Sequence, residues 1–184
     1  ELFQKNADAL SESLGYKPMY HVLNSAGIER FTQYQFDMVR LGIGIYGVSA
    51  IPGNKLAPVA SFKCKVLQVK NLHPSDGTVG YGRHGEIAAD GTVVATIPVG
   101  YADGLDRHLS CGKGSFSING QRVPTIGNIC MDMTMLDVTG MDVKEGDTVT
   151  IFGEDPTVSE LAEILGTIPY EILTSVPRRI ERVI

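Results

Sequence analysis

The sequence predicts a mainly β protein, in which an antiparallel β-barrel or Greek-key-like domain follows an incomplete piece of an α/β barrel. Two observations support this fold class. The first fifty residues alternate helical and strand patterns, whereas the residues after Pro52 form short runs rich in Val, Ile, Thr and Phe, separated by turn signals. The texture changes at IPGNKLAP (51–58). We therefore expect a barrel remnant over residues 1–50 and a β domain over residues 51–184.

The N-terminal piece begins with a helical pattern. Its apolar residues recur at steps of four, three and four: Phe3, Ala7, Leu10 and Leu14. This spacing predicts a helix, which Gly15 is suited to end. The runs MYHVL (19–23) and FDMVRLGI (36–43) predict two parallel strands, the last two of the barrel. A loop over residues 24–27 and one helical turn within residues 29–37 should connect them.

Five strand-like runs follow: SFKCKVLQV (61–69), GTVVATIPV (91–99), GSFSI (114–118), NICMDMTMLDV (128–138) and DTVTIF (147–152). Asn119-Gly120 between GSFSI and QRVPTI predicts a hairpin. One or two short helices should follow the strands. Thr157 and Glu160 predict a capping box for the first, which Gly166 would end, and Pro169 is suited to start the second.

The composition excludes several classes of function. A net charge of -5 among 184 residues argues against a nucleic-acid or anionic-membrane surface, and no apolar run approaches the ~20 residues of a membrane span. The three cysteines form no CxxC pair, and the four histidines lack metal-site spacing. We therefore expect a reducing compartment, no disulfides and no metal site. The chain starts inside a helical pattern without a methionine, which suggests part of a longer protein.

One glycine-rich motif, GIGIYG (42–47), matches a dinucleotide fingerprint, but Pro52 follows at once and no acidic residue lies between Asp37 and Asp76. A better interpretation joins two loops. Ser25 follows the first predicted strand and Gly42 the second, and such neighbouring loops of α/β barrels often build a phosphate site. The alternative is that Ser25 caps a short helix and Gly42 permits a bend.

Five further positions have unusual surroundings. Arg40 lies inside an apolar run, where it either faces a cofactor or anion or forms a salt bridge at the strand end. Tyr81 in TVGYGRH and Tyr101 in GYADGLDRH each follow a glycine, which either makes a turn or clears space beside the ring. In NICMDM, strand alternation would place Met131 on one face and Asp132 on the other.

The assembled pattern resembles alanine racemase, a pyridoxal-phosphate (PLP) enzyme with an α/β barrel and a C-terminal β domain. The matching runs, in the family's order, are HVLNSAG, DMVRLGIGIYG, VGYG, IPVGYADGL, GNICMDM, and PYEIL with an arginine-rich end. They cover nearly the whole chain. The chain would then correspond to roughly the last half of such an enzyme.

The resemblance implies a set of cofactor contacts. Ser25, Gly42 and Ile43 would hold the PLP phosphate, and Arg178 is the candidate for a further phosphate contact. Arg40 would face the pyridine nitrogen. Because arginine keeps its proton, it cannot protonate the ring, which makes the cofactor a weaker electron sink and favours returning a proton over transamination.

The resemblance also implies catalytic roles. Tyr81 would be one of two bases and would reach into the barrel of the other subunit of a homodimer. The second base, the family's Schiff-base lysine, lies on a barrel segment that this chain lacks. Tyr101, Met131 and Asp132 would line the pocket for alanine, with the Met131 N–H as a donor, and Arg107 would lie at the access corridor.

Two positions depart from the family pattern, which usually has arginine at Asn128 and proline at Glu181. The implied function is interconversion of L- and D-alanine in the bacterial cytoplasm, for cell-wall precursors, with this chain inactive alone. Two alternatives stay open. One is a broader amino-acid racemase, for serine or another residue, to which Asn128 points. The other is a non-catalytic dimerisation or ligand-binding domain.

Overall fold

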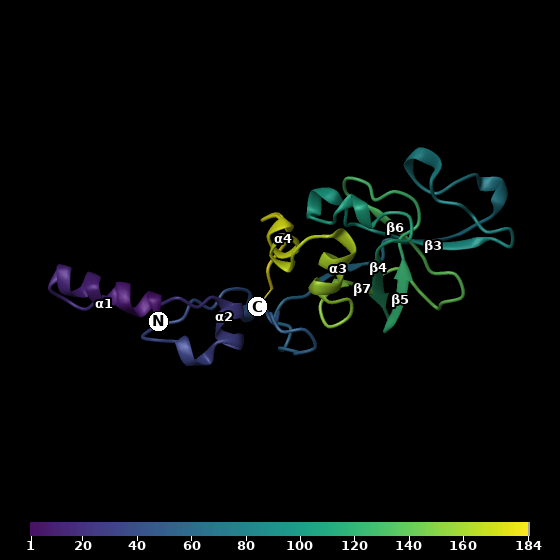
Figure 1. The fold of residues 1–184 in the computed structure, drawn as a ribbon. Coiled ribbons are helices and arrows are strands. Elements are labelled where there is room, and N and C mark those ends of the chain that lie inside the picture. Colours follow the sequence, from purple (N-terminus) through teal and green to yellow (C-terminus); the bar gives the residue numbers. More distant parts are fainter. Residues whose placement is uncertain (184) are drawn as a thin grey trace. The chain divides into compact units, whose positions relative to one another are not determined.

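The computed structural model describes residues 1–183, which divide into two compact units, residues 1–59 and the residues from Ala60 onward. Figure 1 shows the helical elements of the first unit in purple and blue and the strands of the second in teal and green. The hydrophobic core lies within the second unit. Each unit is therefore best understood from its own contacts.

The first unit contains two α-helices and two short 3-10 turns: α1 (Leu2–Leu14), α2 (Ser25–Arg30), η1 (Thr32–Tyr34) and η2 (Ile43–Tyr46). The predicted first helix is confirmed, and Gly15 ends it in the left-handed conformation with φ of 72°. The helical turn predicted within residues 29–37 is present as η1, but the loop predicted over residues 24–27 is wrong, because α2 begins at Ser25. The reason is that the Asn24 side chain caps it by accepting a hydrogen bond from the Gly27 N–H at 3.0 Å.

The prediction of two strands in this unit is wrong. Residues 1–59, all of which the structure describes, form no β-strand. The two apolar segments do run side by side in the same direction, because the Asp37 N–H donates to Tyr20 O at 3.1 Å and the Arg40 N–H donates to Leu23 O at 2.9 Å. These isolated bonds do not make a ladder. Parallel strands need further neighbours, and unit 1 supplies none.

The second unit is mostly β. It contains seven strands: β1 (Phe62–Lys65), β2 (Gln68–Leu72), β3 (Thr92–Ile97), β4 (Ser115–Ile118), β5 (Gln121–Pro124), β6 (Thr134–Asp137) and β7 (Thr148–Phe152). They form two antiparallel sheets, one in the order β1-β7-β4-β5 and the other in the order β2-β3-β6. The predicted hairpin is confirmed as the β4–β5 turn, where Asn119 and Gly120 both have positive φ.

The predicted antiparallel β domain is confirmed, and of its two predicted forms, a β-barrel or a Greek-key-like arrangement, the described strands do not form a closed barrel but two separate sheets. The predicted strand 61–69 is broken at Val66 and Leu67. The Val66 N–H donates to Asp147 O and the Leu67 N–H donates to Thr96 O, so the chain passes there from one sheet to the other. At the opposite edges a single bridge pairs Thr125 with Leu136. One bridge does not make a ladder, which is why the sheets remain separate.

The core fills the space between these sheets and the C-terminal helices. Its largest fully buried members include Phe116, Ile97, Leu109, Ile118, Ile129, Leu136, Ile151 and Leu161. α3 (Val158–Leu165) and α4 (Pro169–Ser175) lie beside each other in Figure 1. α3 contributes Leu161 and Ala162 to this core. Burial of these side chains, at about 25 cal/mol per Å² of apolar surface, is what stabilises the unit.

Of the two hydrogen bonds that make up the capping box predicted at the start of α3, one is present. The Thr157 hydroxyl accepts a hydrogen bond from the Glu160 N–H at 3.1 Å, Gly166 ends the helix, and Pro169 begins α4. The Glu160 carboxylate does not complete the box. It binds the guanidinium of Arg122 on β5 instead, at 2.6 and 2.9 Å.

Candidate functional site

The first unit brings Ser25, Gly42 and Gly44 together. Ser25 is buried, and its hydroxyl oxygen accepts hydrogen bonds from the Gly42 N–H at 2.9 Å and the Gly44 N–H at 3.3 Å. The sequence left open whether these two loops form a phosphate site, or whether Ser25 only caps a short helix and Gly42 only permits a bend. In the structure the two loops do meet. The contact corrects one expectation: the Gly42 N–H is directed to Ser25 and is not a free donor. Because these two N–H groups occupy both acceptor positions of the Ser25 oxygen, the hydroxyl proton remains available to donate a hydrogen bond to another group.

Ile43 and Arg40 lie beside this cluster. Ile43 begins η2, and the first N–H groups of a helical turn lack partners inside that turn. Arg40 is exposed, and its guanidinium donates to Val22 O at 3.3 Å. None of the ion pairs formed within residues 1–183 includes Arg40. The salt-bridge alternative for Arg40 therefore finds no carboxylate partner among the described residues.

Tyr81 stands on a turn of the second unit, η4 (Tyr81–Arg83). Its side chain is 78% exposed. The flanking glycines have φ of 74° at Gly80 and 76° at Gly82, and Arg83 also has positive φ. These values lie in the left-handed region, which side chains other than glycine adopt at a cost. The glycines are thus required by the backbone of the turn, and the turn projects the phenol into solvent.

The turn that carries Tyr101, η5 (Tyr101–Asp103), packs against the loop that follows Asn128. The Tyr101 N–H donates to Cys130 O, and the Ala102 N–H donates to Met131 O, both at 3.0 Å. A Cβ atom at Gly100 would lie 2.3 Å from each of those two carbonyl oxygens. Only glycine permits this approach, so Gly100 is what brings Tyr101 beside Met131.

NICMDM does not form a strand, contrary to the prediction. The Cys130 N–H donates to Met133 O at 2.9 Å, so the chain folds back on itself and the expected alternation of faces is lost. Met131 and Met133 are 54% and 47% exposed. They are therefore surface residues. β6 begins only at Thr134.

Arg179 ties this loop to the Tyr101 turn, and sequence reasoning missed it. Its Nε donates to the buried Asp103 carboxylate at 2.8 Å, and an Nη donates to Asp132 at 3.0 Å. Hydrogen bonds to Asp132 and then Asp103 raise the pKa of Arg179 further. Arg178, the residue chosen from sequence, is exposed. A buried aspartate such as Asp103 requires a cationic partner, but its burial is not visible in the sequence.

The remaining predicted residue, Arg107, is exposed on η6 (Arg107–Leu109). Together with Tyr101 it lines an open groove of about 600 Å³, whose other wall is formed by α4 residues such as Glu171. Tyr101 and Arg107 therefore face the same solvent-filled space. This arrangement suits a route along which a small polar molecule could move.

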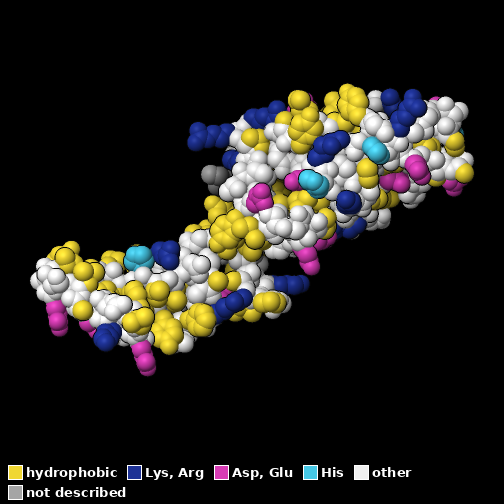
Figure 2. Space-filling view, turned by 45° about the horizontal axis from the view of Figure 1, so that its top comes forward, with side chains coloured by type: hydrophobic (Ala, Val, Ile, Leu, Met, Phe, Trp, Pro, Cys, Tyr) yellow, Lys and Arg dark blue, Asp and Glu magenta, His cyan; other side chains and the backbone are white. Residues whose placement is uncertain are grey.

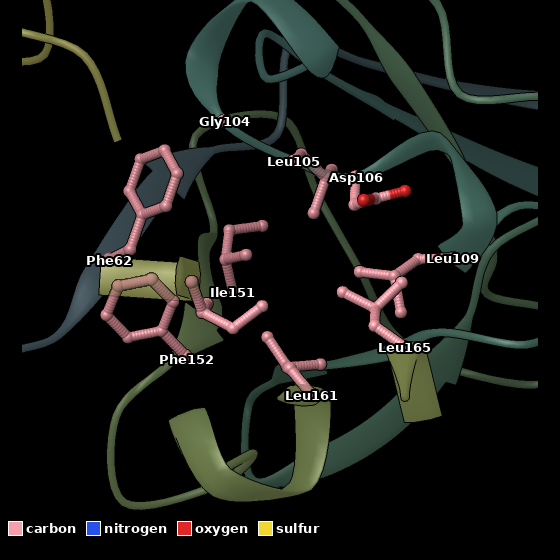
Figure 3. Close-up of a pocket in the computed structure, with 10 residues that line it drawn as sticks. Phe62, Gly104, Leu105, Asp106, Leu109, Ile151, Phe152, Leu161 and Leu165 are labelled. Carbon is pink, nitrogen blue, oxygen red and sulfur yellow. The ribbon is translucent and has the colours of Figure 1, made fainter. Parts of the chain in front are cut away.

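A second cavity lies inside the core and differs in kind. It has a volume of about 10 Å³, and Figure 3 shows side chains such as Phe152, Leu161 and Leu165 pointing into it. A space of this size holds at most about one water molecule. It is a packing gap rather than a site for alanine.

Two further properties bear on function. Within residues 1–183 no group of three His, Cys, Asp or Glu side chains is placed to hold a metal ion, and no helix has the length and hydropathy to cross a bilayer. Burial, together with the charge of Asp103, raises the pKa of Cys64 to about 12. That thiol therefore stays protonated and is a poor nucleophile.

Comparison with known families identifies the class. Residues 59–184 match the family model described as "Alanine racemase, C-terminal domain", and residues 1–50 match "Alanine racemase, N-terminal domain". These two matches place the chain in a family of PLP-dependent amino-acid racemases. The first match covers well over half of the sequence. The chain therefore belongs to the alanine racemase family, of which it is the C-terminal domain with a short piece of the N-terminal domain.

Relatives show the same relationship. The alanine racemase of Desulfosudis oleivorans is 44% identical over 173 residues, which are 89% of this chain and 44% of that protein. The solved alanine racemase of Clostridium difficile 630 in complex with cycloserine has a TM-score of 0.86 at 34% identity. It is covered to 48%, and this chain to 96%. A Bartonella henselae alanine racemase with covalently bound pyridoxal phosphate has a TM-score of 0.81 at 34% identity, with 98% of this chain and 51% of that one covered. The chain thus spans about half the length of these relatives.

Proposed function

We propose that this chain is the C-terminal part of a PLP-dependent alanine racemase that interconverts L- and D-alanine with two bases, of which Tyr81 is one. The observation that carries the proposal is the Tyr81 turn, whose positive-φ glycines present a largely exposed phenol. Residues 1–50 would be the end of the cofactor-binding α/β barrel, and residues 51–184 the C-terminal β domain. In the bacterial cytoplasm the product would supply cell-wall precursors.

The residues of the first unit fit a phosphate group. A phosphate accepts hydrogen bonds, and the buried Ser25 hydroxyl has a proton to donate because the Gly42 and Gly44 amides occupy its oxygen. The Ile43 N–H at the start of η2 is a second donor. Ser25 and Ile43 would therefore hold the PLP phosphate, with Gly42 orienting Ser25 and Arg178 as a further contact.

Arg40 would face the pyridine nitrogen of the cofactor. Its guanidinium makes no ion pair within the described residues, so its donors are available for such a contact. When bound, PLP withdraws electrons from the substrate and makes the α-proton labile. Arg40 would limit this withdrawal, because a guanidinium donates a hydrogen bond without giving up its proton. The proton would then return to the α-carbon.

Tyr81 would remove or return that proton on one face of the substrate. The opposite face requires a second base, and the family's lysine lies outside this sequence. Because Tyr81 is exposed on its own unit, its phenol would serve the barrel of a partner subunit in a homodimer. Tyr101, Asp132 and the Met131 N–H would bind alanine, with Arg107 beside the access groove.

The test uses the intact racemase that contains this chain. Tyr81→Phe removes only the phenolic oxygen, so we expect kcat to fall by about 10³-fold while the absorbance of bound PLP is unchanged. Tyr170→Phe, an exposed tyrosine on α4, is the matched control and should keep full activity. A Tyr81→Phe enzyme within a few fold of wild type would refute the role of Tyr81. It would favour the non-catalytic alternative if wild type were also inactive.

The isolated chain should be inactive. With PLP and L-alanine, the purified chain should form no D-alanine above that of a Tyr81→Phe chain purified in parallel, which reports contaminating racemase. Adding the missing N-terminal half should restore activity, because unit 1 exposes apolar side chains that such a half could cover: Leu2, Leu10, Tyr16, Phe31, Leu41 and Ile45. Activity of the chain alone would contradict the proposal.

A broader racemase is the second candidate, and Asn128 is the observation that favours it. The family usually has a long arginine here, whereas the shorter Asn128 leaves more room near Tyr81. Kinetics of the intact enzyme with alanine and serine, with and without Asn128→Arg, distinguish the two. A preference for alanine that is unchanged by the substitution would remove this candidate.

A further inference from the structure

Asn128 contacts the turn that carries Tyr81. Its Nδ2 donates a hydrogen bond to the backbone oxygen of Tyr81 at 2.8 Å. The two residues are 47 positions apart in sequence. The bond is made to the backbone of the proposed base itself, so it acts on the position of that residue and not on its phenol.

One of the glycines beside Tyr81 makes room for this contact. A Cβ atom at Gly82 would lie 3.1 Å from Asn128 Nδ2 and 2.8 Å from the His84 ring. A Cβ atom at Gly80 would lie 3.6 Å from the backbone nitrogen of Asn128 and 2.8 Å from the Met135 methyl group. The missing side chain at Gly82 therefore lets Asn128 Nδ2 lie directly against the turn, whereas the 3.6 Å at Gly80 is an ordinary van der Waals distance.

Asn128 is itself anchored. Its Oδ1 lies 3.9 Å from the Cys111 sulfur, within reach of a weak S–H···O contact that favours the amide orientation with Nδ2 toward Tyr81. The next residue, Ile129, is buried, and its N–H donates to Ser110 Oγ at 2.9 Å. The donor to the Tyr81 turn thus comes from a fixed part of the β unit.

We propose that Asn128 is a positioning residue that restrains the backbone of the turn on which Tyr81 stands. The inference rests on the proposed role of Tyr81 as a base. Gly80 and Gly82 make the turn conformationally permissive, and a bridge between Val79 and Gly85 closes only its base. The Asn128 bond restrains its tip. Proton transfer depends steeply on the placement of the base, so releasing the tip should slow catalysis more than substrate binding.

Two variants of the intact racemase test the donor. Asn128→Ala removes the amide, and Asn128→Asp keeps its shape but places a carboxylate oxygen against the Tyr81 carbonyl. We expect kcat to fall about 10-fold in Asn128→Ala, as for one lost hydrogen bond, with KM for alanine within about 2-fold. Asn128→Asp should be no better than Asn128→Ala. If Asn128 only fills space, Asn128→Asp would instead keep wild-type activity, which would overturn the proposal.

Two readouts separate positioning from general damage. The α-deuterium isotope effect should rise more in the direction in which Tyr81 removes the proton than in the reverse direction. In this chain itself, amide exchange of residues 80–84 should accelerate in Asn128→Ala and stay at wild-type rates in Asn71→Ala, an exposed asparagine on β2. Unchanged exchange and isotope effects would overturn the inference.

The outcomes also distinguish the inference from the function on which it rests. If Tyr81→Phe retains activity, Tyr81 is not a base, and the proposed function fails. If Tyr81→Phe is inactive but both Asn128 variants match wild type, the function stands and the positioning role of Asn128 fails. If Asn128→Ala does not fold, the isosteric Asn128→Asp gives the result.

Discussion

Backbone contacts decide the placement of the residues that define the proposed site. Gly100 admits two carbonyl oxygens where any side chain would collide, and this brings Tyr101 to Met131. Gly80 and Gly82 permit the backbone conformation of the Tyr81 turn, and Gly82 also leaves room for Asn128. At the residue scale, these glycines determine where the larger neighbouring side chains lie.

Arg178 and Arg179 show how adjacent residues of the same type can differ. Arg179 binds the buried Asp103 and the exposed Asp132, whereas Arg178 faces solvent. A sequence motif does not show which of two neighbouring arginines binds a carboxylate. The choice depends on which side chain points toward a carboxylate, and tertiary packing settles that.

Cys64 should make stability depend on pH in the alkaline range. Burial raises its pKa in the folded chain from 9.0 to about 12. Between these values the unfolded thiol loses its proton and the folded thiol keeps it. Its contribution to stability is therefore complete below about pH 9 and is lost as pH rises toward 12. We expect wild type to lose up to about 1 kcal/mol per pH unit more than Cys64→Ala.

Urea denaturation at pH 8, 9 and 10 measures this difference. Cys111→Ala, which removes an exposed thiol, serves as the control and should follow wild type. Parallel slopes for wild type and Cys64→Ala would show that the Cys64 thiol does not control alkaline stability.

Arg122 links three parts of the second unit. From β5 its guanidinium binds Asp155 at 2.6 Å, in the turn before α3, and Glu160 at 2.6 Å, in the first turn of that helix. It also donates to Ser115 Oγ on β4 at 3.0 Å. A guanidinium between two carboxylates has the fork geometry that makes ion pairs strong, although all three charged groups remain partly exposed.

Arg122→Gln should destabilise the chain by about 1–2 kcal/mol in urea denaturation, because two neighbouring carboxylates lose their cation. Hydrogen bonding to Arg122 lowers the pKa of Asp155, so the stabilisation is present above about pH 4 and is lost as pH falls below it. The difference in free energy of unfolding between Arg122→Gln and wild type should therefore be smaller at pH 3. Lys144→Gln, which breaks an exposed pair, should change stability by less than about 0.5 kcal/mol. Equal effects of the two variants would contradict this role.

Among the elements, local patterns succeeded where neighbours in the sequence decide the conformation. The Asn119-Gly120 hairpin, the Gly15 and Gly166 helix ends and the start at Pro169 needed only adjacent residues. The strand prediction for NICMDM is wrong, because its apolar residues alternate as in a strand although the chain turns there. The amides of the Tyr101 turn take up its carbonyls, and no sequence pattern announces that pairing.

At the scale of the molecule, burial is distributed unequally between the units. The core cluster lies in residues from Phe62 onward. In residues 1–59 the buried apolar side chains are Tyr20, Leu23, Ile43 and Val48, and α1 buries none. Figure 2 shows hydrophobic side chains spread over the surface of this unit, at the left of the view. A 13-residue helix that buries none of its residues is marginal in water.

Limited proteolysis of the isolated chain should therefore cut first within residues 1–59 and leave a resistant product that starts near residue 60. Opening free energies should be near zero in α1 and highest in the strands of the second unit. Mass spectrometry of the products and amide exchange of both units check this. First cuts between residues 90 and 152 would show that the β unit is the weaker one.

The sequence by itself determined the family, the mainly β character and the glycine-framed tyrosines, because these follow from ordered motifs and local backbone requirements. The tertiary structure decided the rest: the division into two sheets, the Ser25 contact with Gly42, the Arg179 contact with Asp103, and the Asn128 bond to Tyr81. Each of these joins residues far apart in the chain. Their formation depends on packing that brings distant backbone groups within hydrogen-bond distance, which no local pattern encodes.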